Sequence, residues 1–410
     1  MTSLVINYYL LIYFLIAVIV VYVILTAYIK IKLRFWRTQP VFHIYNLLYW
    51  IKPPGIISQE TDINRYMNHI NIKTFNISDM DELTLNQFCN FIKNYYVVYS
   101  SPQNSDSVET NYTPTKNNIL GYLEGANHPS FITLYQQPEF LYQNGLVVSS
   151  INSIKGVISA RTLTICLKGV TPFSLYYVDN LCVHPEVRKK GIAPEIIQTH
   201  YYNLRKNNEK IMTCLFKREG ELNAIVPLTT YITTSYDISN LIFPLDTTLH
   251  ASIKIIEIGV LQLSLLVDFI QSLKPLFDCV IMPDITNLVN MIKTENIIIY
   301  GVITNGKLLS IYVFRNIQLY YNGRRAIECI MSLYTYNKDI FVSGFNISLG
   351  KLREKLKNDI IIIENTAHSG GLIANFKMIG VPVLFKSPTA FFLYNYACYS
   401  VPCNKFLILY

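Results

Sequence analysis

The residues best suited by type and spacing to carry chemistry lie at 183–194, where a strand-like run ends in a basic turn and a helix begins. Arg188, Lys189 and Lys190 place three cations directly before Gly191. Free N–H groups and the positive dipole at the start of a helix bind anions, and a glycine lets the backbone approach them closely. The turn therefore suits a pyrophosphate such as that of coenzyme A, although a solvated basic turn without a ligand has the same composition.

The elements that position this turn have the pattern of an α+β domain. Apolar and β-branched runs predict strands at residues 145–150, 156–160, 163–167 and 175–183, and helical periodicity predicts a helix at 193–205. The turn thus connects the last strand to the helix that follows it.

The chain before these strands has three expected parts. Residues 30–60 predict an extended arm. Residues 79–99 have helical periodicity, with Ser78 or Asp79 as the N-cap. Residues 100–118 are rich in Ser, Asn, Thr and Pro and predict a loop.

The rest of the chain repeats the same alternation of strands and helices. Helices are predicted at 260–273 and 346–357, and strands at 296–304, 308–315, 327–336, 360–364, 390–397 and 405–409. The dipeptide Asn305-Gly306 between two of these strands is a hairpin signal. Two successive stretches of one pattern indicate a duplicated α+β fold.

The first 29 residues carry no charged side chain and are rich in Leu, Ile and Val. Such a run is long enough for a hydrocarbon core of about 30 Å and predicts a transmembrane helix. A signal peptide would need a basic start and a shorter apolar run, and a core helix would carry a polar stripe. Four cations follow between residues 30 and 37 and no acid precedes Glu60, so the positive-inside rule places residues 30–410 in the cytoplasm.

Composition limits the other classes of function. The formal net charge is +8, but there is no strongly basic helix and no zinc-finger spacing, so nucleic acid is not an expected partner. The eight cysteines include no C-x-x-C pair and predict scattered, reduced core residues. No local motif supports a catalytic Cys–His pair, and no metal site is expected.

Four sequence blocks carry a resemblance to a known family. The block N-L-C-V-H-x-x-x-R-x-K-x-x-A-P at 180–194 resembles the matching segment of N-myristoyltransferases, and its R-x-x-G-x-A core resembles the acyl-CoA loop of the acetyltransferase superfamily. The same family is matched, in order, by F-W-R-T-Q-P-V at 35–41, P-E-F at 138–140 with the strands that follow, and F-L-Y-N-Y at 392–396. The sequence stops fourteen residues later, as the family does. The resemblance therefore spans residues 35–410.

The resemblance implies a two-half enzyme that transfers a myristoyl group from myristoyl-CoA to the N-terminal glycine amine of a peptide. The backbone N–H groups of Asn180 and Leu181 are expected to form the oxyanion hole. The main-chain carboxylate of Tyr410 is expected to be the base, with its pKa raised by burial. Asp179 and Thr213 are expected near the glycine amine.

The resemblance also implies an acyl-CoA site built from the arm and the turn. Its expected residues are Arg34, Phe35, Trp36, Leu181, Cys182, Val183, Arg188, Lys189, Lys190, Gly191, Ile192, Ala193 and Pro194. Acyl-CoA is expected as a co-substrate, without any permanently bound cofactor. His184 matches a family histidine and is expected to be structural.

Some positions depart from the family pattern. The family has a phenylalanine where this chain has Asn180, and it has an acidic peptide loop where this chain has the neutral run 96–101. Asp106 and Glu109 are the nearest acids to that run. A glycine–aspartate–glycine block of the family is replaced by the uncharged residues 380–383. The peptide preference is therefore expected to differ.

The sequence thus predicts an α+β fold with two acetyltransferase-like halves. Residues 1–29 are the expected transmembrane anchor, 30–225 the acyl-CoA-binding half and 226–410 the peptide-binding half. The expected protein is a single-pass membrane acyltransferase that faces the cytoplasm and meets acyl-CoA, glycine-starting peptides or proteins, and membrane lipid. Two alternatives are left open, namely an inactive membrane scaffold that keeps the fold, and an acetyltransferase-type enzyme with another acyl chain or a lysine acceptor.

Overall fold

A computed structural model describes residues 2–52, 54–61, 63–96, 110–143, 146–220, 224–245 and 249–410. The side chains of residues 2–8, 141–143, 146–148 and 151 are not part of this description. Asp106, Glu109 and the neutral run beyond Tyr96 lie outside the described residues.

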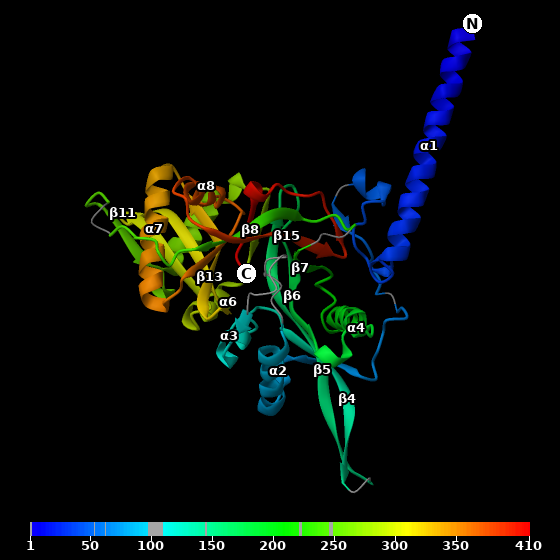
Figure 1. The fold of residues 1–410 in the computed structure, drawn as a ribbon, viewed down its shortest axis with the longest axis horizontal. Helices are drawn as coiled ribbons and strands as arrows, with labels where there is room; N and C mark the ends of the chain where they lie inside the picture. The colour runs from blue at the N-terminus through cyan, green and yellow to red at the C-terminus, as the bar shows by residue number, and fades with distance from the viewer. Residues whose placement is uncertain are drawn as a thin grey trace.

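The chain begins with helix α1 (Thr2–Lys32), which projects from the body of the molecule (Figure 1). Its stretch Tyr9–Lys32 has a mean hydropathy of 3.0 and no buried part, so it is long and apolar enough to cross a membrane. The helix continues three residues beyond the expected anchor at 1–29 and so includes Lys30 and Lys32.

The arm that follows α1 is attached to the body more firmly than an extended arm would be. It contains two 3-10 turns, η1 (Trp36–Thr38) and η2 (Leu47–Trp50), and the short strand β1 (Gly55–Ile56). Val41 and Phe42 between the two turns are buried, because they pack against the end of the first sheet region.

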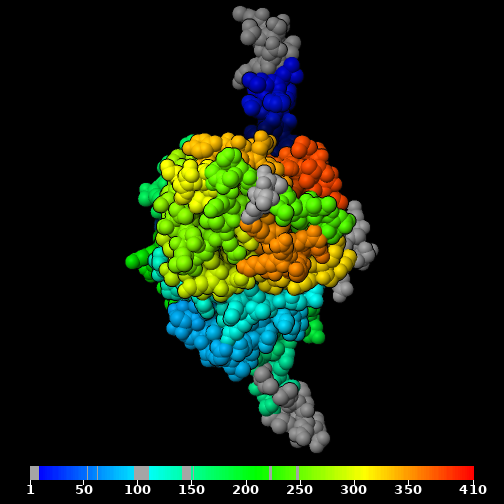
Figure 2. Space-filling model, turned by 90° about the vertical axis from the view of Figure 1, so that its left-hand side faces the viewer, coloured from blue at the N-terminus to red at the C-terminus, as the bar shows by residue number. Residues whose placement is uncertain are grey.

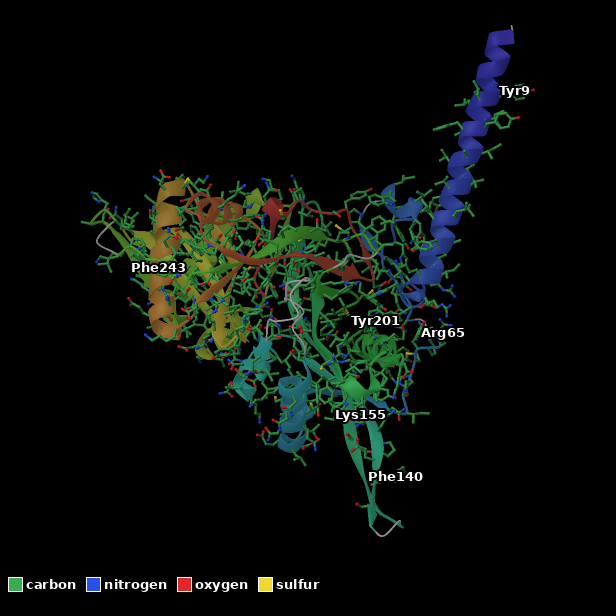
Figure 3. All side chains as sticks on the ribbon, viewed as in Figure 1. Tyr9, Arg65, Phe140, Lys155, Tyr201 and Phe243 are labelled. Carbon is green, nitrogen blue, oxygen red and sulfur yellow. The ribbon has the colours of Figure 1, made fainter. Side chains whose placement is uncertain are left out.

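The first α+β unit surrounds the basic turn. Its elements are β2 (Ile72–Asn76), α2 (Glu82–Tyr95), β4 (Phe131–Gln143), β5 (Leu146–Leu167), β6 (Phe173–Val183), α4 (Ile192–Asn207) and β7 (Cys214–Glu219). Strands β2, β4, β5 and β6 are antiparallel neighbours, and β7 is parallel to β6. The β4–β5 hairpin leaves the body on the side away from α1 (Figure 2), with Phe140 near its end (Figure 3).

The second unit repeats this order. Its elements are β9 (Ile253–Glu257), α5 (Leu263–Leu273), α6 (Ile285–Lys293), β11 (Ile297–Thr304), β12 (Lys307–Tyr321), β13 (Arg324–Tyr334), α7 (Lys338–Leu356), β14 (Ile360–Glu364) and α8 (Gly370–Met378). Strands β9, β11, β12 and β13 are antiparallel neighbours, and β14 is parallel to β13, as β7 is to β6. The predicted duplicated α+β fold is confirmed.

Strands from the second half join the two units into one sheet. Strand β15 (Val383–Tyr394) pairs with β7 on one side and with β8 (Thr229–Asp237) on the other. Strand β10 (Cys279–Met282) pairs with the end of β5 and with β17 (Phe406–Ile408). The expected boundary at residue 225 therefore separates stretches of chain but does not divide the sheet.

Several local predictions need correction. The expected strands at 145–150, 156–160 and 163–167 are one strand, β5, because the polar residues between them stay paired with β4 and β6. Helix α2 is capped by Asp81, whose carboxylate accepts the N–H of Thr84 at 2.9 Å, and not by Ser78 or Asp79. The expected loop at 100–118 contains two further elements, β3 (Thr110–Tyr112) and α3 (Lys116–Leu120).

The helix predicted at 346–357 is α7, which begins eight residues earlier at Lys338.

Two tight hairpins explain the antiparallel order of strands β11, β12 and β13. Asn305-Gly306 and Asn322-Gly323 both have positive φ at each position, the conformation that type I′ turns require and that these residues tolerate. The first of these hairpins was predicted from the sequence.

Candidate functional site

A β-bulge in strand β6 lies where the sequence places the oxyanion hole. Ser159 of β5 pairs with Asp179 and Val157 pairs with Cys182, so Asn180 and Leu181 together oppose a single residue. Asn180 has a left-handed φ of 56°, which asparagine tolerates better than most residues. A bulge interrupts the strand ladder and turns backbone groups away from their regular partners.

The bulge coincides with the point where β6 and β7 separate. Their pairing covers only Tyr176 with Cys214 and Tyr177 with Leu215, although both strands continue beyond it. The bulged part of β6 therefore has no β7 ladder beside it. Splayed parallel strands next to a bulge leave backbone groups open to a bound molecule.

The basic turn has the conformation of an anion cradle. Lys189 and Gly191 both have positive φ, and Gly191 precedes α4 without any side-chain cap. The N–H groups at the start of α4 are therefore available to an anion. Lys189 and Lys190 are exposed, whereas the Arg188 guanidinium donates to the carbonyls of Val183 and Tyr95 at 2.9 and 3.0 Å. Arg188 thus holds the turn in place.

The remaining expected acyl-CoA residues flank this turn. Ile192 is buried, while Ala193 and Pro194 in the first turn of α4 are half-buried. In the arm, Arg34 is exposed and the Phe35 ring meets the Trp36 ring at 5.1 Å. Trp36 stacks on Phe216 of β7 at 5.6 Å, and Phe216 stacks on Phe392 of β15 at 5.3 Å. This stack fixes the arm on the two strands next to the splay.

Asp179 lies immediately before the bulge and is half-buried. Its carboxylate accepts the backbone N–H of Asn180 at 2.7 Å, and the Asn180 side chain donates to Ser159 at 2.9 Å. Burial, and after it the Asp179 charge, raises the pKa of Tyr96, Tyr112 and Tyr177. One of the two expected oxyanion donors is therefore engaged by Asp179 in this structure.

A buried arginine faces the same region from β5. Arg161 pairs with Tyr177 across the strands, and its guanidinium lies 5.6 Å from the Tyr177 ring and 5.1 Å from the Tyr122 ring. It donates to Asn287 of α6 at 2.9 Å. Burial lowers the pKa of Arg161. This residue was not predicted from the sequence, where its signal is a lone cation inside an apolar strand.

Thr213 is not brought next to Asp179. It precedes β7 and is level with Leu175 of β6, four positions from Asp179, which is about 13 Å along a strand. The Thr213 hydroxyl is buried and has no hydrogen-bond partner among the described residues.

Tyr410 is fully buried at the centre of the molecule, where Figure 1 marks the end of the chain. It follows β17, and the N–H of the preceding Leu409 donates to Ile281 of β10 at 3.0 Å. Its ring packs at 5.3 Å from the Tyr177 ring of β6 and at 5.4 Å from the Phe391 ring of β15. Tyr410 therefore packs against the strand that carries the bulge. Its contact on that strand, Tyr177, is three residues before Asn180.

With this geometry established, the chain can be compared with known proteins. No protein-family model matches the sequence, and no curated protein matches it significantly. Among solved structures, Saccharomyces cerevisiae N-myristoyltransferase with bound myristoyl-CoA aligns with a TM-score of 0.67 at 14% identity, covering 90% of this chain and 94% of that one. The same yeast enzyme with myristoyl-CoA and inhibitors aligns with a TM-score of 0.66 at 13% identity, covering 90% and 91%.

The chain has the N-myristoyltransferase fold. The expected resemblance is therefore confirmed at the level of the fold.

On this fold, four charged side chains form a buried network beneath Tyr410. Lys217 of β7 contacts Glu364 of β14 at 2.5 Å and Glu328 of β13 at 3.4 Å. Arg315 of β12 donates to Glu328 at 2.8 Å. The Tyr410 hydroxyl donates to Glu364 at 2.8 Å. Strands from both halves and the last residue are therefore tied to one set of charges.

The charges in the network shift one another's pKa. Burial alone would lower the pKa of Lys217 and Arg315, but the neighbouring acidic groups, Glu328 foremost, together outweigh it and raise both pKa values. Burial would raise the pKa of Glu328, but Arg315 and Lys217 lower it. For Glu364, burial dominates and raises the pKa. One Glu364 oxygen has no hydrogen-bond partner among the described residues.

This network was not predicted from the sequence. Arg315, Glu328 and Glu364 are single charges within apolar runs, such as the Glu within A-I-E-C-I at 326–330, whereas Lys217 is followed directly by Arg218 and Glu219. A charge at a core-facing strand position has to be paired, because an isolated buried charge is very costly. That pattern was present in the sequence but does not reveal which charges pair.

All eight cysteines are free, as predicted, but Cys166, Cys398 and Cys403 are only half-buried, so the expected core position holds for the other five. Burial raises the pKa of Cys89 and Cys182 to about 11 and that of Cys214 to about 12, so these thiols stay protonated.

The ring of His184 lies 4.4 Å from the ring of Tyr95, and His184 accepts the N–H of Glu186 at 3.4 Å. These contacts fit the structural role expected for it.

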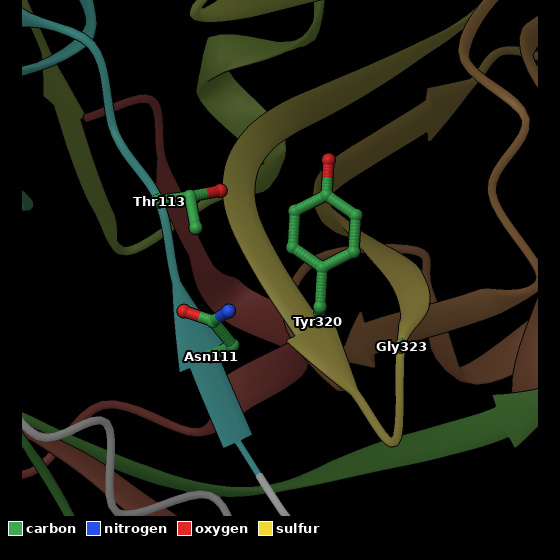
Figure 4. Close-up of a pocket in the computed structure, with 4 residues that line it drawn as sticks. All are labelled: Asn111, Thr113, Tyr320 and Gly323. Carbon is green, nitrogen blue, oxygen red and sulfur yellow. The ribbon is translucent and has the colours of Figure 1, made fainter.

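A surface cavity of about 280 Å³ lies beside β3 and the end of β12 (Figure 4). Its described lining residues are Asn111, Thr113, Tyr320 and Gly323. None of them belongs to the expected site. Tyr112 alternates with Asn111 and Thr113 along β3 and contacts Tyr96 at 5.7 Å, so the cavity opens on the other face of this strand.

The network predicts strongly coupled stability effects. Arg315→Met or Glu328→Leu alone should lower the free energy of unfolding by about 3–5 kcal/mol, because each leaves an uncompensated buried charge. The double variant should lose much less than the sum of the two. Denaturant unfolding of the full chain in detergent measures all three variants.

The matched control is the exposed pair Lys355–Glu257, whose atoms are 2.9 Å apart. Lys355→Met should cost under about 1 kcal/mol. Additive losses for Arg315→Met and Glu328→Leu would show that the two side chains are not coupled.

Proposed function

We propose that the protein is a membrane-anchored N-acyltransferase that moves a fatty acyl group, myristoyl in the first instance, from acyl-CoA to an N-terminal glycine amine. The observation that carries this proposal is the bulge at Asn180 and Leu181 beside the uncapped start of α4, on the N-myristoyltransferase fold. An anion cradle next to backbone N–H groups at a strand bulge is the arrangement that a CoA thioester needs. The yeast structures of this fold hold myristoyl-CoA.

In this proposal the turn and the arm bind the CoA portion. The N–H groups of α4 and the exposed Lys189 and Lys190 meet the phosphates, while Arg188 keeps the turn in its conformation. The Trp36 stack holds the arm against the same end of the sheet. The thioester carbonyl then lies at the bulge, where the Asn180 and Leu181 N–H groups stabilise the oxyanion. Losing one such donor typically costs about 2.7–4 kcal/mol in the transition state.

The acceptor amine must lose a proton before it attacks. We assign this role to the main-chain carboxylate of Tyr410, whose side chain contacts Tyr177 of β6. The neutral amine attacks the thioester carbon, the tetrahedral intermediate expels the CoA thiolate, and the second amine proton neutralises that thiolate. Asp179 attracts the incoming ammonium.

The helix α1 is proposed as a single membrane span with the remaining chain in the cytoplasm. Its exposed apolar surface supports the span, and the cations that follow it support the orientation. Residues 30–225 would bind acyl-CoA and residues 226–410 the peptide.

One observation favours the inactive scaffold as a second candidate. The Asn180 N–H, one of the two expected oxyanion donors, already donates to Asp179 at 2.7 Å. Activity requires Asp179 to release this N–H when it binds the acceptor ammonium. A protein in which Asp179 never does so would bind acyl-CoA without transfer.

The basic turn provides a test of acyl-CoA binding. At low ionic strength, Lys189→Glu with Lys190→Glu should weaken myristoyl-CoA binding at least about tenfold, because two reversed charges then repel the phosphates with little screening by salt. This loss of affinity should become smaller as the salt concentration rises. Isothermal titration at two ionic strengths measures it.

Lys206→Glu in the last turn of the same helix is the matched control, because it is exposed and far from the turn. Its affinity should stay within about twofold of the parent protein, as expected for a distant screened charge. Equal affinities for the double variant and this control at low salt would place CoA elsewhere.

The role of the Tyr410 carboxylate is tested by moving it. A short extension after Tyr410 replaces the carboxylate with an amide, which cannot accept the proton, so the transfer rate should fall about 10²–10⁴-fold while acyl-CoA binding persists. Tyr410→Phe keeps the carboxylate and should retain most of the rate. It should instead lower stability by about 1–3 kcal/mol, because Glu364 loses its hydroxyl partner.

Single-turnover mass spectrometry of a glycine-starting peptide gives both rates. An extended protein that works at the parent rate would remove the carboxylate from the mechanism. The base would then be Asp179 or a water-relayed group.

A further inference from the structure

Exposed apolar side chains gather on η2 and the residues that flank it. We call Ile44, Leu47, Leu48, Trp50 and Ile51 the arm patch. Leu48 is 67% exposed and Ile51 is 82% exposed. Contiguous apolar side chains of this kind on a surface mark an interaction site more often than scattered ones do.

The arm patch is held firmly on the body. Phe42 just before it is 2% exposed and packs with Val226 and Ala397. The Trp50 indole N–H donates to the Ile44 carbonyl at 3.1 Å, and the Tyr399 hydroxyl donates to the Trp50 carbonyl at 2.8 Å. The patch is therefore preformed and moves with the sheet.

The arm patch also lies beside α1. The Tyr22 hydroxyl donates to the carbonyl of Tyr45 at 2.7 Å, and the Lys30 ammonium lies 5.2 Å from the Tyr45 ring. Tyr22 is ten residues before Lys32, which is about 15 Å along the helix axis. The patch thus lies alongside the apolar part of α1 and not beyond its basic end, as the lighter blue segment next to α1 shows (Figure 1).

Cations flank the patch along the chain. Exposed cations at 30, 32, 34, 37 and 52 accompany it, and the sequence has no acid before Glu60. Apolar side chains with cations close by in the chain complement the boundary between headgroups and acyl chains of an anionic bilayer. The same charges would repel a second copy of this face.

We propose that the arm patch is a second membrane contact, which inserts into the anionic leaflet that α1 enters and fixes the orientation of the acyltransferase domain on the bilayer. This inference rests on the proposed span of α1. It adds that the domain lies on the membrane surface with the residues of the arm at the lipid boundary. A domain tethered by α1 alone would turn freely.

The two tryptophans of the chain, Trp36 and Trp50, make a direct test possible. Trp50 belongs to the arm patch, whereas Trp36 is half-buried in its stack on Phe216. The full chain is reconstituted into vesicles of neutral and anionic phospholipid, with and without brominated acyl chains. Trp36→Phe leaves only Trp50 as the fluorophore, and Trp50→Phe leaves only Trp36.

Brominated lipid should quench Trp50 at least about twofold more strongly than Trp36, because a tryptophan at the interface meets the acyl chains. Leu48→Asp with Ile51→Asp, in the Trp36→Phe background, should reduce Trp50 quenching to the level of Trp36. Ile242→Asp is the matched control and should leave it unchanged. Ile242 is 93% exposed and is the neighbour of Phe243, which lies at the far end of the molecule from α1 (Figure 3).

Retention of the chain in membranes after an alkaline wash reports on α1 separately. If the chain stays in the membranes and both tryptophans are quenched equally and weakly, α1 spans the bilayer but the arm patch does not enter it. Protein would then cover the patch. Loss of retention with strong Trp50 quenching would overturn the span and keep the patch as a peripheral contact. Neither result depends on whether acyl transfer is observed.

Discussion

Charges that have no water around them must neutralise one another, and this constraint fixes the centre of the molecule. Lys217, Arg315, Glu328 and Glu364 come from β7, β12, β13 and β14, and each has a partner in the set. A shift of any strand would leave a charge unpaired in the core, at a cost of several kcal/mol. The network therefore sets the register between the two halves, and Tyr410 is attached to it through Glu364.

The proposed chemistry depends on that register. Tyr410 reaches β6 only because β17 pairs with β10, and β10 pairs with the end of β5. The bulge at Asn180 and the separation of β6 from β7 then open backbone groups near the packed Tyr410–Tyr177 rings. The basic turn and α4 follow directly in the chain, so one strand–turn–helix segment supplies both the donors and the anion cradle.

Local pattern predicted much of this fold. The strand before the turn, helix α4, the Asn305-Gly306 hairpin and the strand 360–364 could be found because periodicity and turn chemistry act over a few residues. The helix start at Asp81 and the continuity of β5 were missed, because competing caps and interior polar residues are resolved only by pairing. The motif blocks pointed to Asn180 and Leu181, but the bulge at these residues is visible only in the strand pairing. The buried network needed contacts between strands more than 100 residues apart along the chain.

The proposed activity of this bulge and turn is the transfer of an acyl group from CoA to a glycine amine. The most direct measurement is mass spectrometry of two peptides of one sequence, incubated with the full chain in detergent and myristoyl-CoA. One peptide begins with a free glycine, and the other has that glycine acetylated. The account predicts that the free peptide gains one acyl group for each CoA thiol released and that the blocked peptide gains none. Release of CoA without acylation of either peptide, or acylation of the blocked peptide on a lysine, would contradict it.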